Sequence, residues 1–186
     1  MGHHLILGNL TDALTGEPLD DTHDERYRQG LIRLLLNDRG YAKSDLSARH
    51  PLTVRADARS GTLAIDLLVT LRERITMLVK YGPGSLVTRE RAALAAGRLV
   101  APYQIPIVAI TNGIDAHIMD GAKGKVIATG LDAIPDRDQL GTIRRRAIFQ
   151  PISASRVERE SRLLYCYEID GACPCDDTVC RLPASS

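Results

Sequence analysis

The sequence predicts an α/β fold in which a mixed central sheet is flanked by helices. Two observations lead to this prediction. Helical and strand-like apolar patterns alternate along the chain, in the order helix, three strands, helix and strand, followed by a hairpin and terminal helices. Apolar residues make up 44% of the 186 residues, which is enough for the core of one ordinary domain.

The first elements are an arm and a helix. Residues 1–21 contain several Gly and Pro turn signals and predict an amino-terminal arm. The apolar spacing of residues 22–40 predicts a helix, which Gly40 would end. Thr22 and Glu25 have the spacing of a capping box at its start.

The central part of the sequence predicts three strands and a second helix. The strands are expected at 51–57, 61–71 and 75–81, where apolar residues alternate with polar ones or form short continuous runs. Residues 82–84, Gly-Pro-Gly, break the chain sharply. The Ala- and Arg-rich stretch 85–103 then predicts a helix that ends near two prolines.

The rest of the chain predicts another strand, a hairpin and two helices. The strand is the apolar run 105–113, which closes on Asn-Gly, and the hairpin is 116–130. Helices are expected at 136–148 and 153–169. For the second of these, Ser155 and Glu158 predict a capping box. We therefore expect three regions: an amino-terminal arm at 1–21, a single domain at 22–168 and a cysteine-containing tail at 169–186.

An acid and a base occur in the two strands of the first predicted hairpin. The odd-numbered residues of both strands are the more apolar, and residues that face each other in an antiparallel pair point to the same side. A turn of odd length, such as residues 72–74, therefore places Asp66 opposite Lys80 on the more polar face. This pattern fits a partly buried ion pair, and it also fits the remains of a metal-dependent nuclease centre.

With Asp66 and Lys80 on consecutive strands, the chain resembles the PD-(D/E)XK nuclease fold, and in particular the amino-terminal domain of type I restriction enzyme R subunits. The resemblance rests on the segments ERYRQGLIRLLLNDRGYAKSDL (25–46), AIDLLVTL (64–71), MLVKYGPGSL (77–86) and YQIPIVAITNG (103–113), which follow the family's order. It implies that the domain at 22–168 has a restriction endonuclease-like αβββαβ core followed by carboxy-terminal helices.

The resemblance assigns roles to three residues. Asp66 matches the strand aspartate that binds the metal, and Lys80 matches the lysine of the (D/E)-X-K triplet. Glu25 matches a helical acid that completes the site in some relatives, although its spacing from Thr22 equally fits a helix cap. The resemblance thus implies Asp66, Lys80 and Glu25 as catalytic residues, with Asp66 and Glu25 as the Mg²⁺ ligands.

The sequence departs from the family pattern at two places. Leu78 stands where the triplet has its acid, and leucine cannot bind a metal. Ala64-Ile65 precedes the aspartate, so the proline of the motif is missing as well. If the site is active, the resemblance implies a Mg²⁺-dependent DNA endonuclease, because Mg²⁺ can be held by one or two carboxylates plus phosphate. We expect instead that cleavage is weak or lost. The alternative is a non-catalytic domain on the same fold that binds nucleic acid or another protein.

DNA is the partner that the resemblance implies. The candidate phosphate contacts are Arg89, Arg91, Arg98, Arg144, Arg145, Arg146, Lys123 and Lys125. Such charged runs are also typical of solvated helix faces. The net charge of +1 excludes a strong field over the whole protein that would attract nucleic acid. The sequence lacks the phosphate-binding loop of ATP-driven motors, so a motor or modification subunit would be another chain.

Four cysteines lie close together near the end of the chain, and they are Cys166, Cys173, Cys175 and Cys180. Four thiols at such spacing can bind Zn²⁺, although the paired C-x-x-C pattern is missing, so free thiols or oxidative pairing remain open. No apolar stretch reaches the about 20 residues of a membrane span, and no signal peptide is evident. We therefore expect no membrane partner and a cytoplasmic location.

Overall fold

A computed structural model describes residues 5–170 of the chain. The core elements follow the order that the sequence predicts. They are α1 (His23–Arg33), β3 (Leu46–Ala56), β4 (Arg59–Leu71), β5 (Arg74–Tyr81), α2 (Val87–Leu99) and β6 (Ile107–Thr111). The elements after this core are β7 (Ala116–Asp120), β8 (Val126–Thr129), α3 (Arg137–Arg146) and α4 (Ala154–Tyr165). The arm contains a two-stranded ribbon of β1 (Asn9–Thr11) and β2 (Pro18–Asp20).

Short helices complete the described part of the chain. They are η1 (Leu34–Asp38), η2 (Lys43–Asp45), η3 (Leu131–Ala133) and η4 (Cys166–Asp170). The first of them continues α1 directly, and the last continues α4. Both long helices are thereby extended by one wider turn.

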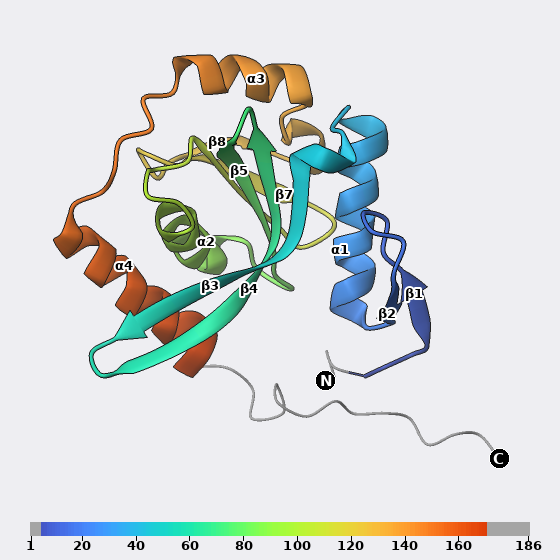
Figure 1. Cartoon of the computed structure of the whole chain (residues 1–186), viewed down its shortest axis with the longest axis horizontal. Helices are drawn as coiled ribbons and strands as arrows, with labels where there is room; N and C mark the ends of the chain where they lie inside the picture. Colours follow the sequence, from blue (N-terminus) through green and yellow to red (C-terminus); the bar gives the residue numbers. More distant parts are fainter. Residues whose placement is uncertain (1–4, 171–186) are drawn as a thin grey trace.

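The six strands β3 to β8 form one mixed sheet in sequence order. Only β5 and β6 pair in parallel, and α2 makes the crossover between them. All other neighbouring strands in this sheet are antiparallel. The prediction of an α/β fold with a mixed central sheet flanked by helices is confirmed (Figure 1).

Each face of the sheet is covered by its own helices and has its own apolar core. One core joins the sheet to α2 and α4 and includes Ala96 and Leu164. The other joins the opposite face to α1 and α3 and includes Ile32 and Leu140. The molecule therefore has three layers, with the sheet buried between two helical layers (Figure 1).

The turn between β4 and β5 differs from the prediction, although its consequence is the same. The turn has two residues, Arg72 and Glu73, which both adopt positive φ, as a tight hairpin turn requires. At the irregularity between Val69 and Thr70, a β-bulge, the ladder skips Thr76 of β5, and this extra residue, rather than a turn of odd length, shifts the register by one. Beyond the bulge Leu68 pairs with Leu78 and Leu67 with Val79. If this register continues by one pair, it sets position 66 opposite position 80.

The strand β3 is longer than the predicted 51–57, because it begins at Leu46. The ladder of pairs between β3 and β4 is interrupted at Arg49 and Asp66, and Arg49 has a φ of 54°. At this interruption the odd-numbered side chains of β4 change from one face of the sheet to the other. Ile65 packs in the core under α2, whereas Leu67 packs in the core under α1. The prediction that the odd-numbered residues of β4 share one face is therefore correct only from residue 67 onwards.

The helix starts agree only in part with the predicted capping boxes. At α1 the Thr22 hydroxyl accepts a hydrogen bond from the backbone N–H of Glu25 at 3.2 Å, as expected. The second bond of a capping box would run from the backbone N–H of Thr22 to the carboxylate of Glu25. It is absent, because the backbone N–H of Thr22 donates to the carbonyl of Asp20. At α4 the predicted box is wrong, because Ser153 caps the helix and accepts from Arg156, two residues earlier than predicted. The carboxylate of Glu25 is thus available for other contacts.

The contact between α2 and the sheet depends on a glycine. A Cβ added at Gly97 would lie 2.3 Å from Cγ2 of Val108 in β6. We expect Gly97→Ala to destabilise the protein by about 1–2 kcal/mol, because the forced shift outweighs the better helix propensity of alanine. Urea unfolding followed by circular dichroism measures this change. Gly30→Ala in α1 is the matched control, since a Cβ there meets nothing within 4 Å. Equal effects of the two changes would contradict the prediction.

Candidate functional site

The candidate residues lie where α1 crosses the sheet. Glu25 is on the first turn of α1, Asp66 is in β4 and Lys80 is near the end of β5. All three are buried, with 7%, 6% and 7% of their surface exposed. Buried charges require partners, so the contacts of each side chain define what the site can do.

Asp66 is paired with an arginine of α1. Its Oδ1 accepts hydrogen bonds from Arg28, with Nη2 at 2.8 Å and Nε at 3.2 Å. Its Oδ2 accepts from the backbone N–H of Tyr81 at 2.9 Å. Both oxygens of this carboxylate are therefore used within the protein, and a direct ion pair of Asp66 with Lys80 is not among its contacts.

Glu25 is held by two arginines and an amide. Its Oε2 accepts from Nη1 of Arg28, and its Oε1 accepts from Nη2 of Arg49 at 2.5 Å and from Nε2 of Gln29 at 2.8 Å. Arg28 thus lies between the carboxylates of Glu25 and Asp66 and contacts both. Only 15% of its side chain is exposed.

The ion pairs continue from Glu25 into the amino-terminal arm. Arg49 bridges Glu25 to Asp12, with its Nη1 at 2.9 Å from Oδ2 of Asp12. The oxygen of the Gln29 side chain accepts from the backbone N–H of Ala13 at 2.8 Å. We call the continuous series Asp12, Arg49, Glu25, Arg28 and Asp66 the ion-pair chain. It joins the arm, α1, β3 and β4 in one network.

The charges in the ion-pair chain shift the acidity of its members. Burial alone would raise the pKa of Glu25, but hydrogen bonds from Arg49 and Gln29 and the charges of Arg28 and Arg49 outweigh it and lower the pKa below the ordinary value. The pKa of Asp12 is also lowered, because hydrogen bonds from Leu14 and Arg49 outweigh its burial. Both carboxylates are therefore held in the ionised form.

Lys80 has a separate partner, which comes from the carboxy-terminal part of the described chain. Its Nζ lies 2.9 Å from Oε2 of Glu168 in η4. The neighbouring Ile169 covers β4 at Gly61, where an added Cβ would lie 2.8 Å from Cγ2 of the isoleucine. The segment after α4 therefore packs over the sheet and neutralises the lysine locally.

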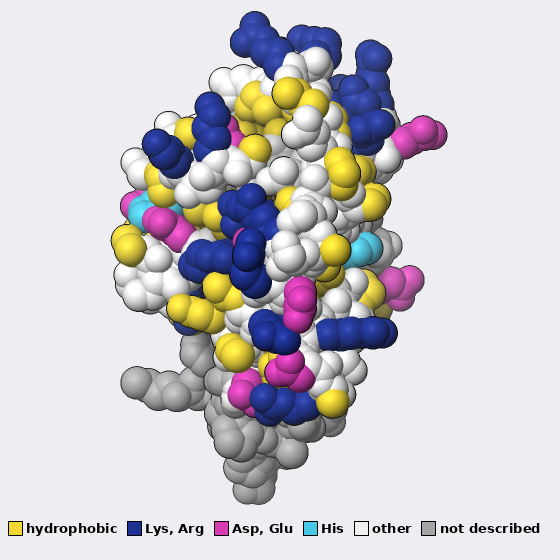
Figure 2. All heavy atoms as spheres, turned by 90° about the vertical axis from the view of Figure 1, so that its left-hand side faces the viewer, with side chains coloured by type: hydrophobic (Ala, Val, Ile, Leu, Met, Phe, Trp, Pro, Cys, Tyr) yellow, Lys and Arg dark blue, Asp and Glu magenta, His cyan; other side chains and the backbone are white. Residues whose placement is uncertain are grey.

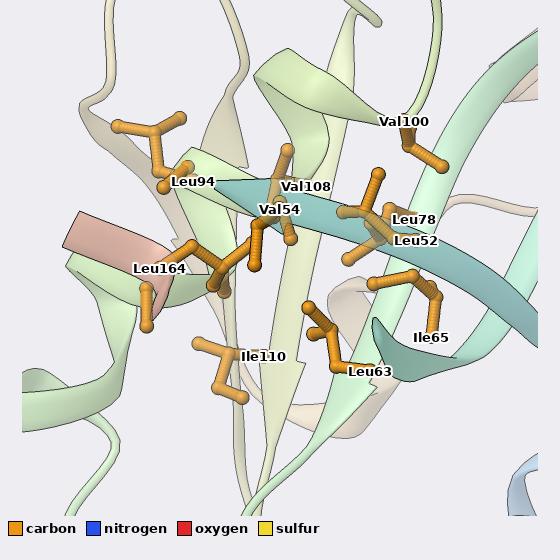
Figure 3. Packing of buried hydrophobic residues seen from close by; sticks show 14 of the residues in the cluster. Leu52, Val54, Leu63, Ile65, Leu78, Leu94, Val100, Val108, Ile110 and Leu164 are labelled. Atoms are coloured by element: carbon orange, nitrogen blue, oxygen red, sulfur yellow. The ribbon is translucent and has the colours of Figure 1, made fainter. Parts of the chain in front are cut away.

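Leu78 occupies the position of the acid in the (D/E)-X-K pattern, and it belongs to the apolar core. It is fully buried under α2 and faces Leu68 across the β4–β5 pair. Figure 3 shows its side chain beside Leu52 and near Ile65. This position thus contributes to packing and offers no ligand to a metal.

The residues present do not fit the Mg²⁺ site that the resemblance implies. Within residues 5–170 no group of three or more His, Cys, Asp or Glu side chains could hold a metal ion. The oxygens of Glu25 and Asp66 that would face a cation instead accept hydrogen bonds from Arg28. We therefore assign no reaction step to a metal at this site.

Several of the candidate basic residues are committed to structural contacts. Arg91 and Arg98 turn towards Glu160 of α4, at 2.5 and 2.8 Å. Arg89 donates to the carbonyl of Pro83, and Arg144 donates to the carbonyl of Leu71. Arg91 is nevertheless exposed, and Lys123, Lys125, Arg145 and Arg146 are exposed as well, near the β7–β8 turn and the end of α3.

Only one of the four cysteines of the predicted zinc site lies within the described residues. Cys166 is exposed and forms no disulfide with another described residue. Cys173, Cys175 and Cys180 lie outside residues 5–170, so the zinc prediction remains a prediction. No helix in the described part of the chain is long and apolar enough to cross a membrane.

Sequence reasoning missed the arginines that complete the site. Arg28 lies three residues after Glu25, a spacing that places both on one face of a helix, so this pair had a detectable signal. Arg49 had none, because it lies before the predicted strand in a backbone conformation that the sequence does not mark. The role of Glu168 depends on how the end of α4 packs, which local patterns do not encode.

The fold and the site define an α/β domain with a carboxylate and lysine cluster between its first helix and its sheet. Residues 23–135 match the family model described as the amino terminus of the type I restriction enzyme R protein. Because this match covers more than half of the chain, the protein belongs to that family. Searches of curated proteins and of solved structures found no match.

The family match ends before α3 and α4. The chain nevertheless uses this later part for its core, since Leu164 and Tyr165 of α4 are buried against the sheet and α2. It also uses it at the candidate site, through the contact of Glu168 with Lys80. The carboxy-terminal helices are therefore part of the same structural unit as the family region.

Proposed function

We propose that this chain is a nuclease-like domain of the R-protein family in which metal-dependent DNA cleavage is lost or severely weakened. The observation that carries the proposal is the position of Arg28, whose guanidinium contacts both Glu25 and Asp66. In an active centre of this design, these two carboxylates would be the ligands of Mg²⁺. Here an internal cation takes the place of the metal.

A guanidinium is a stable substitute for the charge of a metal ion but not for its chemistry. Arginine stays protonated at all physiological pH values, so it neutralises the two buried carboxylates permanently. It has no open coordination position, and therefore it cannot activate a water molecule in the way that a bound metal does. The internal ion pairs keep the fold stable while the centre loses its means of hydrolysis.

The environment of the other two positions supports the same conclusion. Leu78 is buried in the core and cannot serve as the second anionic ligand of the triplet. Lys80 is paired with Glu168, so its charge is compensated within the protein rather than offered to a reacting phosphate. We therefore favour a role in binding, with DNA or a motor or modification subunit as the expected partners, over a role in catalysis.

A plasmid-cleavage assay tests the proposal. Purified protein is incubated with supercoiled plasmid and Mg²⁺ or Mn²⁺, and with EDTA as the metal-free reference. We expect the wild type to nick or cut no faster than Asp66→Ala. Asp132→Ala is the matched control, because Asp132 is an exposed carboxylate with a single surface partner, Arg39. Cleavage that requires the metal, survives in Asp132→Ala and disappears in Asp66→Ala would refute the proposal.

A further inference from the structure

A hollow with apolar walls lies at the beginning of β6, whereas Ile110, which pairs with Lys80, lies near the end of that strand. Its volume is about 520 Å³, and it is enclosed by the beginning of β6, the β7–β8 turn, α3 and the segment 147–150. Ile107 lines it, and Ile107 precedes Ile110, the partner of Lys80 in the sheet, by three residues. The hollow is therefore roughly 10 Å along the strand from the candidate site.

Several residues that line this hollow are apolar, and two of them are unusually exposed. Ile107 and Ile143 form part of the floor, while Ile127 and Ile148 stand at the edge. Ile148 is 79% exposed and Ile127 is 57% exposed. Single exposed apolar residues are common, but two large ones that line one hollow are typical of a binding surface.

Cations surround the apolar surface. Lys123 and Arg146 line the hollow, and Lys125 is exposed two residues after Lys123. Arg145 lines a different hollow, together with Asp138 and Arg144. Figure 2 shows apolar side chains between groups of Lys and Arg side chains in the upper part of this face. Among residues 5–170, no ion pair involves Lys125 or Arg146, and the ion pair of Lys123 is with Asp120.

The single carboxylate that lines the hollow is already used. Asp120 accepts hydrogen bonds from the backbone N–H groups of Ala122 and Lys123, at 3.0 and 2.8 Å, and thereby holds the β7–β8 turn. Its ion pair with Lys123 is long, at 3.8 Å. The rim therefore remains positive, and an occupant with negative charge is favoured.

We propose that this hollow binds an acidic segment of another protein that carries large apolar side chains. The apolar walls would take up the apolar side chains of the partner, and the cations of the rim would pair with its carboxylates. Nucleic acid fits less well, because its phosphate backbone offers no apolar surface that could pack on Ile127 and Ile148. A second copy of this chain fits less well, because two positive rims would face each other.

The position of β8 adds to the suitability of this surface for a peptide. β8 is the last strand of the sheet and pairs only with β7 within the described chain. Its outer edge therefore presents backbone groups beside Ile127, where an extended segment can pair with them. Lys125 immediately precedes this strand. A lysine beside an edge strand discourages nonspecific pairing, but its charge would attract an acidic partner.

Fluorescence anisotropy with the full chain and three labelled peptides tests the proposal. The first peptide is amphipathic, with Leu on one face and Glu elsewhere; the second has Ser in place of Leu; and the third has Lys in place of Glu. We expect the first peptide to bind at least about tenfold more tightly than the other two, and to weaken as salt is added. Ile148→Asp and Arg146→Glu are each expected to weaken it about tenfold or more.

Two matched variants control for general effects of charge and surface polarity. Val87→Asp changes an apolar residue that is 67% exposed at the start of α2, and Arg159→Glu reverses an exposed charge on α4. Both should bind the first peptide as the wild type does. Equal binding of the three peptides, or an unchanged affinity in Ile148→Asp, would overturn the proposal.

Two further measurements distinguish an acidic peptide from the other two candidate partners of this hollow, DNA and a second copy of the chain. If duplex DNA displaces the peptide and its own binding depends on Arg146 but not on Ile148, the surface belongs to nucleic acid and the proposal fails. If sedimentation shows self-association that Ile148→Asp abolishes, the surface is an interface between copies, and the proposal fails as well. Neither result depends on whether the chain cleaves DNA.

Discussion

Arg28→Met is expected to destabilise the protein by about 3 kcal/mol, at the lower end of the cost of breaking a buried ion pair. The change keeps the apolar stem of the side chain but removes the charge between Glu25 and Asp66. The cost stays at the lower end because Glu25 keeps Arg49 and Asp66 keeps the backbone N–H of Tyr81. The measurement is the midpoint of urea unfolding at constant slope.

Arg33→Met on the same helix is the control for this prediction. Arg33 is exposed in the last turn of α1, so its loss should change the free energy of unfolding by no more than about 0.5 kcal/mol. The double variant Arg28→Met, Asp66→Asn should be less destabilised than the sum of its single changes, since the two groups interact directly. Wild-type stability in Arg28→Met would show that the guanidinium does not neutralise the two carboxylates.

The same variant also tests the idea that the guanidinium occupies the position of a metal. Removing it leaves two buried carboxylates that a divalent cation could neutralise, so Mn²⁺ should raise the melting temperature of Arg28→Met. The wild type should show no such rise, because Arg28 holds both groups. A similar response in both proteins would mean that Mn²⁺ binds elsewhere.

Glu160→Gln is expected to destabilise the protein by about 3–5 kcal/mol. Glu160 lies on α4, only 2% exposed, and its carboxylate pairs with Arg98 and Arg91 of α2 and lies 3.5 Å from Arg156. Arg98 is buried as well, and its Nε has no hydrogen-bond partner in the described residues. Neutralising Glu160 would therefore leave a buried cation without its counter-charge. Unfolding by urea, monitored by circular dichroism, measures the loss.

A neighbouring glutamate provides the control for Glu160. Glu158 on the same helix pairs with Arg162 on the surface, so Glu158→Gln should cost no more than about 0.5 kcal/mol. If the two changes had equal effects, the contact between α2 and α4 would depend on apolar packing alone.

The acidity of Glu160 gives this second prediction a pH dependence. Burial alone would raise its pKa, but the hydrogen bond and charge of Arg91 and the charge of Arg98 outweigh burial and lower the pKa below the ordinary 4.5. Its contribution to stability is therefore complete above about pH 4.5 and is lost as the pH falls below that value. The wild type should lose stability on acidification, and Glu160→Gln should lack part of that loss.

The sequence predicted the fold class and the order of the core elements because both follow from local patterns. Alternation gave β4 and β5, and apolar spacing gave α1 and α2. The face shared by Leu67 and Val79 followed from the same alternation. The prediction failed where the backbone departs from regularity, at the bulge after Val69 and at the positive φ of Arg49, because single residues with unusual dihedral angles leave no periodic signal.

The sequence by itself determined that Asp66 and Lys80 lie in neighbouring strands and that Leu78 cannot act as an acid. Only the tertiary structure decided what these residues contact. Arg28, Arg49 and Glu168 reach the site from α1, β3 and η4, and their ion pairs join residues far apart in the chain. Such pairs depend on the three-dimensional placement of long flexible side chains, whereas periodicity reports only which face of an element is buried.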